Sequence, residues 1–253
     1  MYMEIEPSRP FFGRMGGKSR IANKLISLFP DPNSYTTYVE PFIGAGNIFF
    51  RKPYQSQTEV INDLDDIVYD IFKGVKTEGD LIERLKPIPY LSKTKFKQLL
   101  DKPNKTWIDL LIIIKTSFYA QGKSYSNPPS DSTNYILQNT DFIKYKDRLK
   151  NVKITNLSFE KLIDKYNTTN TFFYLDPPYE ASKDYSNSVD PQDMYNAVKK
   201  IKGKFMLSYN DSPLIRSLFK EFHIHNIKTM YELGGFFQGS SKRIINEVYI
   251  TNY

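Results

Sequence analysis

The sequence predicts an α/β fold with a doubly wound, Rossmann-like sheet and a mainly helical insertion. Short β-type runs alternate with amphipathic runs in the first and last parts of the chain, which is the pattern of an α/β architecture. The stretch from Arg84 to Lys150 lacks this alternation and is rich in lysine and aromatic residues. We therefore expect residues 1–80 and 151–253 to form one domain, with residues 81–150 as an inserted region.

Each expected strand is a short run of β-type residues that ends near a turn-forming or acidic residue. Strands are predicted at residues 36–40, 59–63, 152–157, 171–176 and 204–209. The first strand ends at Pro41-Phe42-Ile43-Gly44-Ala45-Gly46, a turn-forming stretch that we expect to lead into an apolar helix. The second strand runs into a helical pattern over residues 64–75.

The composition narrows the possible classes of site. Lys and Arg outnumber Asp and Glu by 35 to 28, a net charge of +7, and the chain has no cysteine. Disulfides, thiolate nucleophiles and cysteine-ligated zinc are therefore excluded. His223 and His225 lie two residues apart, and without a third ligand a half-exposed strand explains them better than a metal site. We expect no bound metal.

The sequence carries no sign of export. The N-terminus has neither the basic start nor the apolar run of a signal peptide, and no stretch approaches membrane-spanning length. We expect an intracellular protein, in the cytoplasm or within a host cell. We also expect a monomer or weak dimer that does not bind membranes.

The positive charge is concentrated in the inserted region. Residues 84–150 contain 13 Lys and Arg against 5 Asp and Glu, a difference of +8, so the rest of the chain is close to neutral. A run of charge is often only a solvated face, but positive charge mixed with aromatic rings also suits nucleic acid. The candidate contacts with nucleic acid are Lys93, Lys95, Lys97, Lys115, Lys123 and Tyr125.

A pair of glycines and an acid indicate a nucleoside cofactor. Gly44 and Gly46 follow the first strand, where a missing Cβ lets a ligand approach the backbone. Asp63 ends the next strand, and an acid there can accept both hydroxyls of an adenosine ribose. A glycine-rich helix entry beside a helix-capping aspartate explains the pair equally well. Phe49 breaks the G-x-G-x-x-G fingerprint of dinucleotide-binding folds.

The stretch Gly13-Arg14-Met15-Gly16-Gly17-Lys18-Ser19 superficially matches a phosphate-binding loop. A P-loop has four residues between its glycines, whereas Gly13 and Gly17 enclose three. ATP hydrolysis is therefore disfavoured. Lys18 still offers a point charge for a carboxylate or a phosphate, and a plain N-terminal turn is the alternative.

The strongest signal is Asp176-Pro177-Pro178-Tyr179, which follows a strand pattern. An aryl amine is a poor nucleophile because its lone pair is delocalised into the ring. A carboxylate and a backbone carbonyl that accept its two N–H bonds would free that lone pair for attack on a methyl group. Pro177, with a fixed φ and no N–H, can hold such a carbonyl. Tyr179 can stack on the aromatic base that carries the amine. A strand-ending turn is the alternative.

These motifs resemble those of the D12 class of N6-adenine DNA methyltransferases, the family of the bacterial Dam enzymes. The similar segments, in chain order, are Arg14-Met15-Gly16-Gly17-Lys18, Tyr38-Val39-Glu40-Pro41-Phe42-Ile43-Gly44-Ala45-Gly46, Asn62-Asp63, Asp176-Pro177-Pro178-Tyr179, Leu207-Ser208 and Asn246-Glu247-Val248-Tyr249-Ile250-Thr251-Asn252-Tyr253. They span nearly the whole chain in the family's order. The resemblance implies a Rossmann-like class I methyltransferase sheet that carries an inserted target-recognition region.

The resemblance also implies an activity and a set of site residues. Such an enzyme transfers a methyl group from S-adenosyl-L-methionine to N6 of an adenine that is flipped out of double-stranded DNA. The catalytic residues carried over are Asp176, Pro177, Pro178 and Tyr179, and the cofactor-binding residues are Arg14, Lys18, Glu40, Pro41, Gly44, Gly46, Asp63, Ser158, Phe159 and Asp176. Ser158 stands where family members often have an acid, and it can still form a hydrogen bond.

Other functions remain as alternatives. N4-cytosine enzymes typically begin the tetrapeptide with Ser, and glutamine and ribosomal RNA enzymes with Asn, so Asp176 disfavours both. A catalytically silent nucleic-acid-binding protein on the same fold is a different class of function, which cofactor turnover would distinguish. A nicotinamide oxidoreductase is disfavoured by Phe49 and by the lack of a hydride-transfer His or Tyr-Lys pair.

Overall fold

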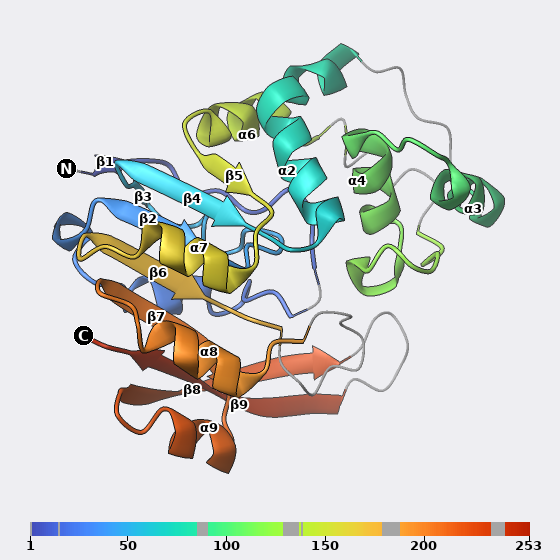
Figure 1. The fold of residues 1–253 in the computed structure, drawn as a ribbon. Helices are drawn as coiled ribbons and strands as arrows, with labels where there is room; N and C mark the ends of the chain where they lie inside the picture. Colours follow the sequence, from blue (N-terminus) through green and yellow to red (C-terminus); the bar gives the residue numbers. More distant parts are fainter. Residues whose placement is uncertain are drawn as a thin grey trace.

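A seven-stranded sheet lies at the centre of the part of the chain formed by its first and last segments (Figure 1). The computed structural model describes residues 2–14, 16–84, 91–128, 137, 139–178, 188–233 and 241–253. The strands have the order β5-β4-β2-β6-β7-β9-β8. Their bounds are β2 Thr37–Glu40, β4 Thr58–Asn62, β5 Lys153–Thr155, β6 Thr171–Leu175, β7 Lys204–Asn210, β8 His223–Leu233 and β9 Ser241–Thr251. A separate two-stranded sheet pairs β1 (Met3–Glu4) with β3 (Tyr54–Gln55).

The strand order creates a switch point between β2 and β6. From β5 to β7 all neighbouring strands are parallel, and only β9 and β8 add antiparallel pairs at the other edge. The chain moves outward from β2 through β4 to β5 and later returns to place β6 on the other side of β2. Loops that leave neighbouring strands in opposite directions open a crevice, so the carboxyl ends of β2 and β6 are the expected ligand site.

The two faces of the sheet are covered by different segments. In β6 every residue is buried, with Phe172 and Tyr174 on one face and Phe173 and Leu175 on the other. The first face is covered by the N-terminal segment and by α1 (Ala22–Ile26), which precedes the short η1 (Pro32–Ser34). The second face packs against helices of the later half, namely α7 (Phe159–Tyr166), α8 (Pro191–Val198) and α9 (Pro213–Leu218).

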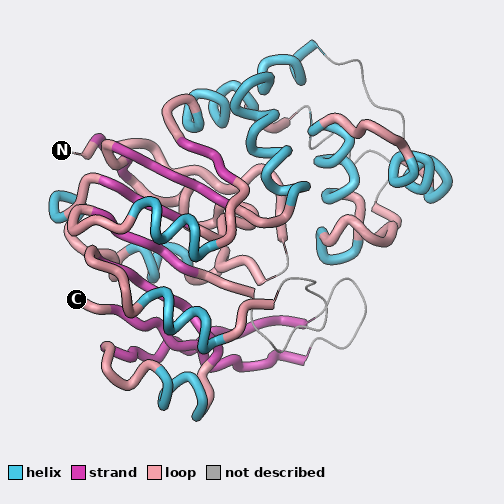
Figure 2. Tube along the Cα trace, in the orientation of Figure 1, coloured by secondary structure: helices cyan, strands magenta, loops and turns pink. Residues whose placement is uncertain are grey.

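The inserted part of the chain is helical where the structure describes it (Figure 2). Its helices in sequence order are the end of η2 (Gly79–Arg84), α3 (Lys93–Asp101), α4 (Trp107–Lys115), η3 (Phe118–Ala120) and α6 (Phe142–Leu149), and α2 (Asp66–Glu78) precedes them. A capping box of Thr106 and Asp109 starts α4, whose next residues are almost all apolar and buried against α2. Among these described helices, none is long and apolar enough to cross a lipid bilayer.

The predicted strands all form, each within two residues of its expected bounds. The prediction of an apolar helix after Gly46 is wrong, because residues 41–52 form successive turns instead. Gly44 and Gly46 have φ of +50° and +79°, outside the helical region, and Pro53 limits any extension. The helix expected at residues 64–75 begins two residues later because Asp65 caps it, accepting from Ile67 N at 2.9 Å.

Candidate active site

A cavity of about 960 Å³ opens at the carboxyl ends of the five parallel strands. Its lining combines these strand ends with the N-terminal segment, the start of α8 and three residues of the insertion. The lining residues are Arg14, Gly16, Gly17, Lys18, Glu40, Pro41, Phe42, Ile43, Gly44, Ala45, Asn47, Ile48, Asn62, Asp63, Leu64, Asp65, Ala120, Gln121, Lys123, Leu157, Ser158, Phe159, Glu160, Tyr174, Asp176, Pro177, Pro178, Ser188, Val189, Asp190, Asp193 and Asn210. The volume is within the usual range of small-molecule sites.

Asp63 holds the glycine turn in place. Its Oδ2 accepts from Gly44 N at 2.9 Å and its Oδ1 accepts from Asp65 N at 3.0 Å. Burial raises the pKa of Asp63 to about 6, although both backbone N–H groups act to lower it. A Cβ on Gly46 would lie 2.9 Å from the Phe50 ring, so this turn requires glycine by contact as well as by φ. The helix-capping alternative for Asp63 is wrong, since Asp65 caps α2.

Asn62 ties three strand ends together, a role that the sequence did not single out. Its Nδ2 donates to Pro41 O and to Leu157 O, both at 2.9 Å. Its Oδ1 accepts from Leu157 N and from Thr155 Oγ1, both at 2.8 Å. The side chain is buried, so these bonds fix the loops after β2, β4 and β5 relative to one another.

Glu40 and Arg14 bring further charge to the cavity. Tyr38 Oη donates to Glu40 Oε2 at 2.7 Å. Burial raises the pKa of Glu40 well above its ordinary value, against the effect of this hydrogen bond. Arg14 is paired through Nη2 with Asp65, and its Nη1 is buried without a hydrogen-bond partner. A donor left unmet in this way suits a ligand acceptor.

Asp176 stands at the end of β6, beside a lysine from the start of the chain. Lys18 Nζ lies 2.9 Å from Asp176 Oδ1, and the Lys18 side chain is only 2% exposed. Ser208 Oγ, on the neighbouring strand β7, donates to the same Oδ1 at 2.8 Å. Pro177 and Pro178 follow in the cavity wall. Tyr179 and Met15 lie outside the described residues.

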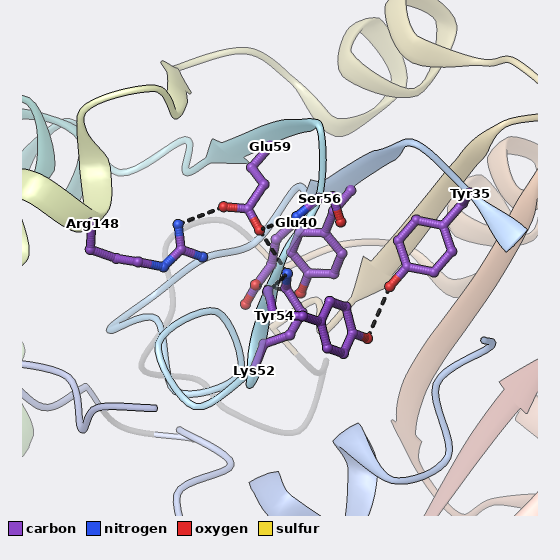
Figure 3. A network of polar contacts seen from close by, with 8 residues as sticks. Tyr35, Glu40, Lys52, Tyr54, Ser56, Glu59 and Arg148 are labelled. Carbon is purple, nitrogen blue, oxygen red and sulfur yellow. Dashed lines mark hydrogen bonds and ion pairs between the residues drawn. The ribbon is translucent and has the colours of Figure 1, made fainter. Parts of the chain in front are cut away.

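A buried polar network braces the turn after β2 against the insertion (Figure 3). Lys52 Nζ donates to Glu59 Oε1 at 2.6 Å and lies over the Tyr38 ring, 4.7 Å from its centroid. Arg148 of α6 donates from Nη1 to Glu59 Oε2 at 2.5 Å. Burial lowers the pKa of Lys52 to about 8. The network therefore joins α6, β4 and the strand end that carries Glu40.

The other expected cofactor residues lie on the cavity wall. Ser158 caps α7, accepting from Lys161 N at a long 3.5 Å. Phe159, the first residue of that helix, packs with Phe42 at a ring-centroid distance of 5.7 Å. Pro41 also lines the wall. The structure thus brings the described residues expected for cofactor binding to one cavity wall, except Gly46, which packs behind it against Phe50.

The expected DNA-contacting residues occupy different environments. Lys93, Lys95 and Lys97 are exposed on α3. Lys123 is exposed and lines the cavity mouth. Lys115 is half-buried at the end of α4, and burial lowers its pKa to about 8. For these lysines, contact with DNA stays a prediction.

Tyr125 has a packing role within the insertion. Its hydroxyl donates to Leu91 O, and its ring lies 5.4 Å from that of Phe96. This packing explains an aromatic residue at position 125 without DNA. Contact of Tyr125 with DNA stays a prediction.

Two neighbouring aromatic side chains stand out from the surface of the insertion. Phe118 and Tyr119 are 54% and 70% exposed, next to the cavity-lining Ala120. Tyr119 and Ala120 have φ of +51° and +53°, an uncommon conformation for residues other than glycine. Periodicity could not have found this feature, because it depends on a strained loop after α4.

The histidines lie on β8, where the sequence placed them. His223 and His225 are exposed, and His225 stacks on Tyr249 at 4.6 Å. Within the described part of the chain, no group of three or more His, Cys, Asp or Glu residues could hold a metal ion.

Comparisons with known proteins identify the family. The family model described as D12 class N6 adenine-specific DNA methyltransferase matches residues 15–233. The Type II methyltransferase M1.LlaDCHI of Lactococcus lactis subsp. cremoris is 28% identical over 283 residues, covering 97% of this chain and 95% of that protein. The Type II methyltransferase M.CviBI of Paramecium bursaria Chlorella virus NC1A is 24% identical over 261 residues, covering 96% and 97%.

A shorter match has a more specific name. The DNA adenine methylase of Haemophilus influenzae is 33% identical over 81 residues, which are 32% of this chain and 27% of that protein. The family model itself covers most of the chain and takes in the glycine turn, Asp63 and Asp176. The chain therefore belongs to the D12 class of N6 adenine-specific DNA methyltransferases.

Proposed function

We propose that this chain transfers a methyl group from S-adenosyl-L-methionine to N6 of an adenine that is flipped out of double-stranded DNA. The observation that carries the proposal is the position of Asp176. It lies at the end of β6, in the same cavity as the glycine turn and Asp63 on the neighbouring strand ends. The site therefore combines a place for a nucleoside cofactor with an acceptor for an amine.

The residues on the cavity wall fit an adenosine cofactor that carries positive charge. Gly44 leaves the backbone open to close approach, and each carboxylate oxygen of Asp63 keeps a lone pair beyond its backbone bond. Glu40 offers a buried carboxylate that a positive group would stabilise in its charged form. Arg14 offers the unmet Nη1 donor. When bound, S-adenosylmethionine supplies a methyl group on a positively charged sulfur, which is open to nucleophilic attack.

Asp176 and the following prolines prepare the attacking amine. The carboxylate accepts one N–H of adenine N6, and a proline carbonyl accepts the other, which restores nucleophilic character to the nitrogen. Lys18 and Ser208 hold Oδ1 of Asp176, so the carboxyl group is fixed before substrate enters. We assign stacking on the extruded base to Tyr179.

The insertion supplies the surface for DNA. We propose residues 81–150 as the target-recognition region, because the excess of positive charge lies there and Gln121 and Lys123 reach the cavity wall. Exposed Phe118 and Tyr119 lie at the same place, where rings can stack on bases.

Nucleoside analysis tests the proposal directly. The purified protein, S-adenosylmethionine and methylation-free duplex DNA should give N6-methyladenine by mass spectrometry. Asp176→Ala should abolish the product, because the acceptor for the amine is lost. The change also removes the close partner of the buried Lys18 ammonium, so thermal stability should fall and the assay is run well below the unfolding midpoint of the variant. Asp211→Ala is the matched control, because Asp211 pairs with Arg216 outside the cavity lining. N4-methylcytosine, or no product on varied DNA, would refute the proposal.

A further inference from the structure

Lys18 lies between two carboxylates that come from distant parts of the chain. Its Nζ is 2.9 Å from Asp176 Oδ1 and 3.8 Å from Glu247 Oε1. The side chains of Lys18 and Glu247 are 2% and 4% exposed. A loop near the N-terminus, the end of β6 and the last strand β9 therefore meet at one ammonium group.

The register of β9 places Glu247 at this point. Glu247 pairs with Asn210 of β7, and Tyr249 pairs with Ser208, whose hydroxyl bonds to Asp176. Alternate residues of a strand share a face, so Glu247 lies on the same face as Ser208 and one pair closer to the cavity. Val248, on the opposite face, is buried in the apolar core.

The two distances differ in kind. At 2.9 Å the contact with Asp176 is a hydrogen bond, whereas 3.8 Å is beyond hydrogen-bond length and leaves an electrostatic attraction. A shift of the ammonium by about 1 Å would exchange these roles. A buried carboxylate is stable only beside cations or donors, so Glu247 is already suited to receive the closer contact.

We propose that Glu247 is a positioning residue that takes up the Lys18 ammonium when adenine N6 bonds to Asp176. This rests on the proposed function. Asp176 Oδ1 accepts from Lys18 and Ser208 before substrate arrives, so an incoming N–H competes for the same carboxylate. A second carboxylate lets Lys18 move aside without being left as an unpaired buried charge.

Glu247→Gln tests this with little change in shape. In single-turnover methylation with enzyme in excess, the rate constant should fall about tenfold, because Lys18 stays on Asp176. The amplitude and the Kd for S-adenosylhomocysteine, measured by calorimetry, should stay within about twofold. The methylation rate of the Lys18→Gln variant is followed by tritium counting over hours. Adding Glu247→Gln to this variant should change that rate little further.

Glu59→Gln is the control for loss of a buried carboxylate paired with lysine. Glu59 lies outside the cavity lining and bonds to Lys52 and Arg148. This change should therefore lower thermal stability and should reduce the rate constant less than Glu247→Gln does, because its network reaches the cavity only through Tyr38 and Glu40. An unchanged rate constant in Glu247→Gln, or a loss confined to amplitude, would overturn the inference. If the wild-type protein leaves no N6-methyladenine, the proposed function fails instead.

Discussion

Lowering the pH from 7 to 5 should weaken cofactor binding about tenfold through Asp63. Burial raises the pKa of Asp63 to about 6. If binding requires the ionised form, about nine-tenths of the protein is competent at pH 7 and about one-tenth at pH 5. The difference corresponds to roughly 1.4 kcal/mol of binding free energy.

Under the proposed function, the bonds that Asp63 already makes explain why cofactor binding should require its ionised form. Gly44 N and Asp65 N each occupy one carboxylate oxygen, which leaves one lone pair on each for a ribose hydroxyl. Protonation places a hydrogen where one hydroxyl would donate. It also weakens the grip of the carboxyl group on the Gly44 turn.

The assay is calorimetric titration with S-adenosylhomocysteine, without DNA, between pH 5 and 7. Asp63→Asn should bind more weakly at pH 7 and lose the tenfold component of the pH profile. Glu40, whose pKa burial also raises, accounts for any slope that remains. A variant with weaker binding but the wild-type slope would show that another group titrates, and a flat wild-type profile would refute the reasoning.

Asp63 contributes to folding stability and to cofactor affinity with opposite pH dependence. Acid unfolding therefore does not mimic the loss of cofactor binding. A carboxyl group whose pKa is raised from 3.8 to about 6 binds more protons when folded than when unfolded in that window. The contribution of Asp63 to the free energy of unfolding therefore falls as pH rises from about 4 to about 6. In the same window, cofactor affinity rises.

Three further variants test the site and its surroundings. Gly46→Ala should lower the free energy of unfolding, measured by heat or urea, by roughly 1–3 kcal/mol. The reason is that φ is +79° and the new Cβ would lie 2.9 Å from the Phe50 ring. An unchanged unfolding midpoint would contradict this contact. Asn62→Ala removes four hydrogen bonds between strand ends. It should lower the free energy of unfolding by roughly 2–4 kcal/mol and weaken cofactor binding in calorimetry. Unchanged affinity would show that the loops keep their positions without Asn62. Replacing both Phe118 and Tyr119 by Ala should lower DNA affinity roughly 5- to 50-fold in fluorescence anisotropy and leave stability unchanged, since both are exposed; equal affinity would remove them from the DNA surface.

Local sequence signals located the parts of the site that sit directly on strand ends. Gly44, Asp63 and Asp176 each follow an apolar run, so strand prediction placed them at one sheet edge, and the structure brings them to one cavity. The turns after Gly46 were predicted as a helix because an apolar run, Ile48-Phe49-Phe50, follows the glycines. Positive φ at two glycines decides the conformation there, and spacing does not reveal φ.

Contacts between distant segments could not be predicted. The sequence offered Lys18 as a point charge for a carboxylate or a phosphate, but it did not indicate that the carboxylate is Asp176, which the chain brings near only through the sheet. The same holds for Arg148, whose bond to Glu59 ties the end of the insertion to β4. Such pairs depend on how helices pack on the sheet, and neither partner carries a local pattern.

The distribution of charge gives a reason for base extrusion that is independent of the motif. Among described residues the cavity lining has seven acids, Glu40, Asp63, Asp65, Glu160, Asp176, Asp190 and Asp193, against three cations, Arg14, Lys18 and Lys123. The insertion has the opposite sign, +8 over residues 84–150. A negative cavity attracts a positively charged cofactor and repels phosphate, while the insertion attracts the DNA backbone. Under the proposed function, these charges would hold the backbone outside, and the uncharged base is the part of a nucleotide that could enter without electrostatic penalty.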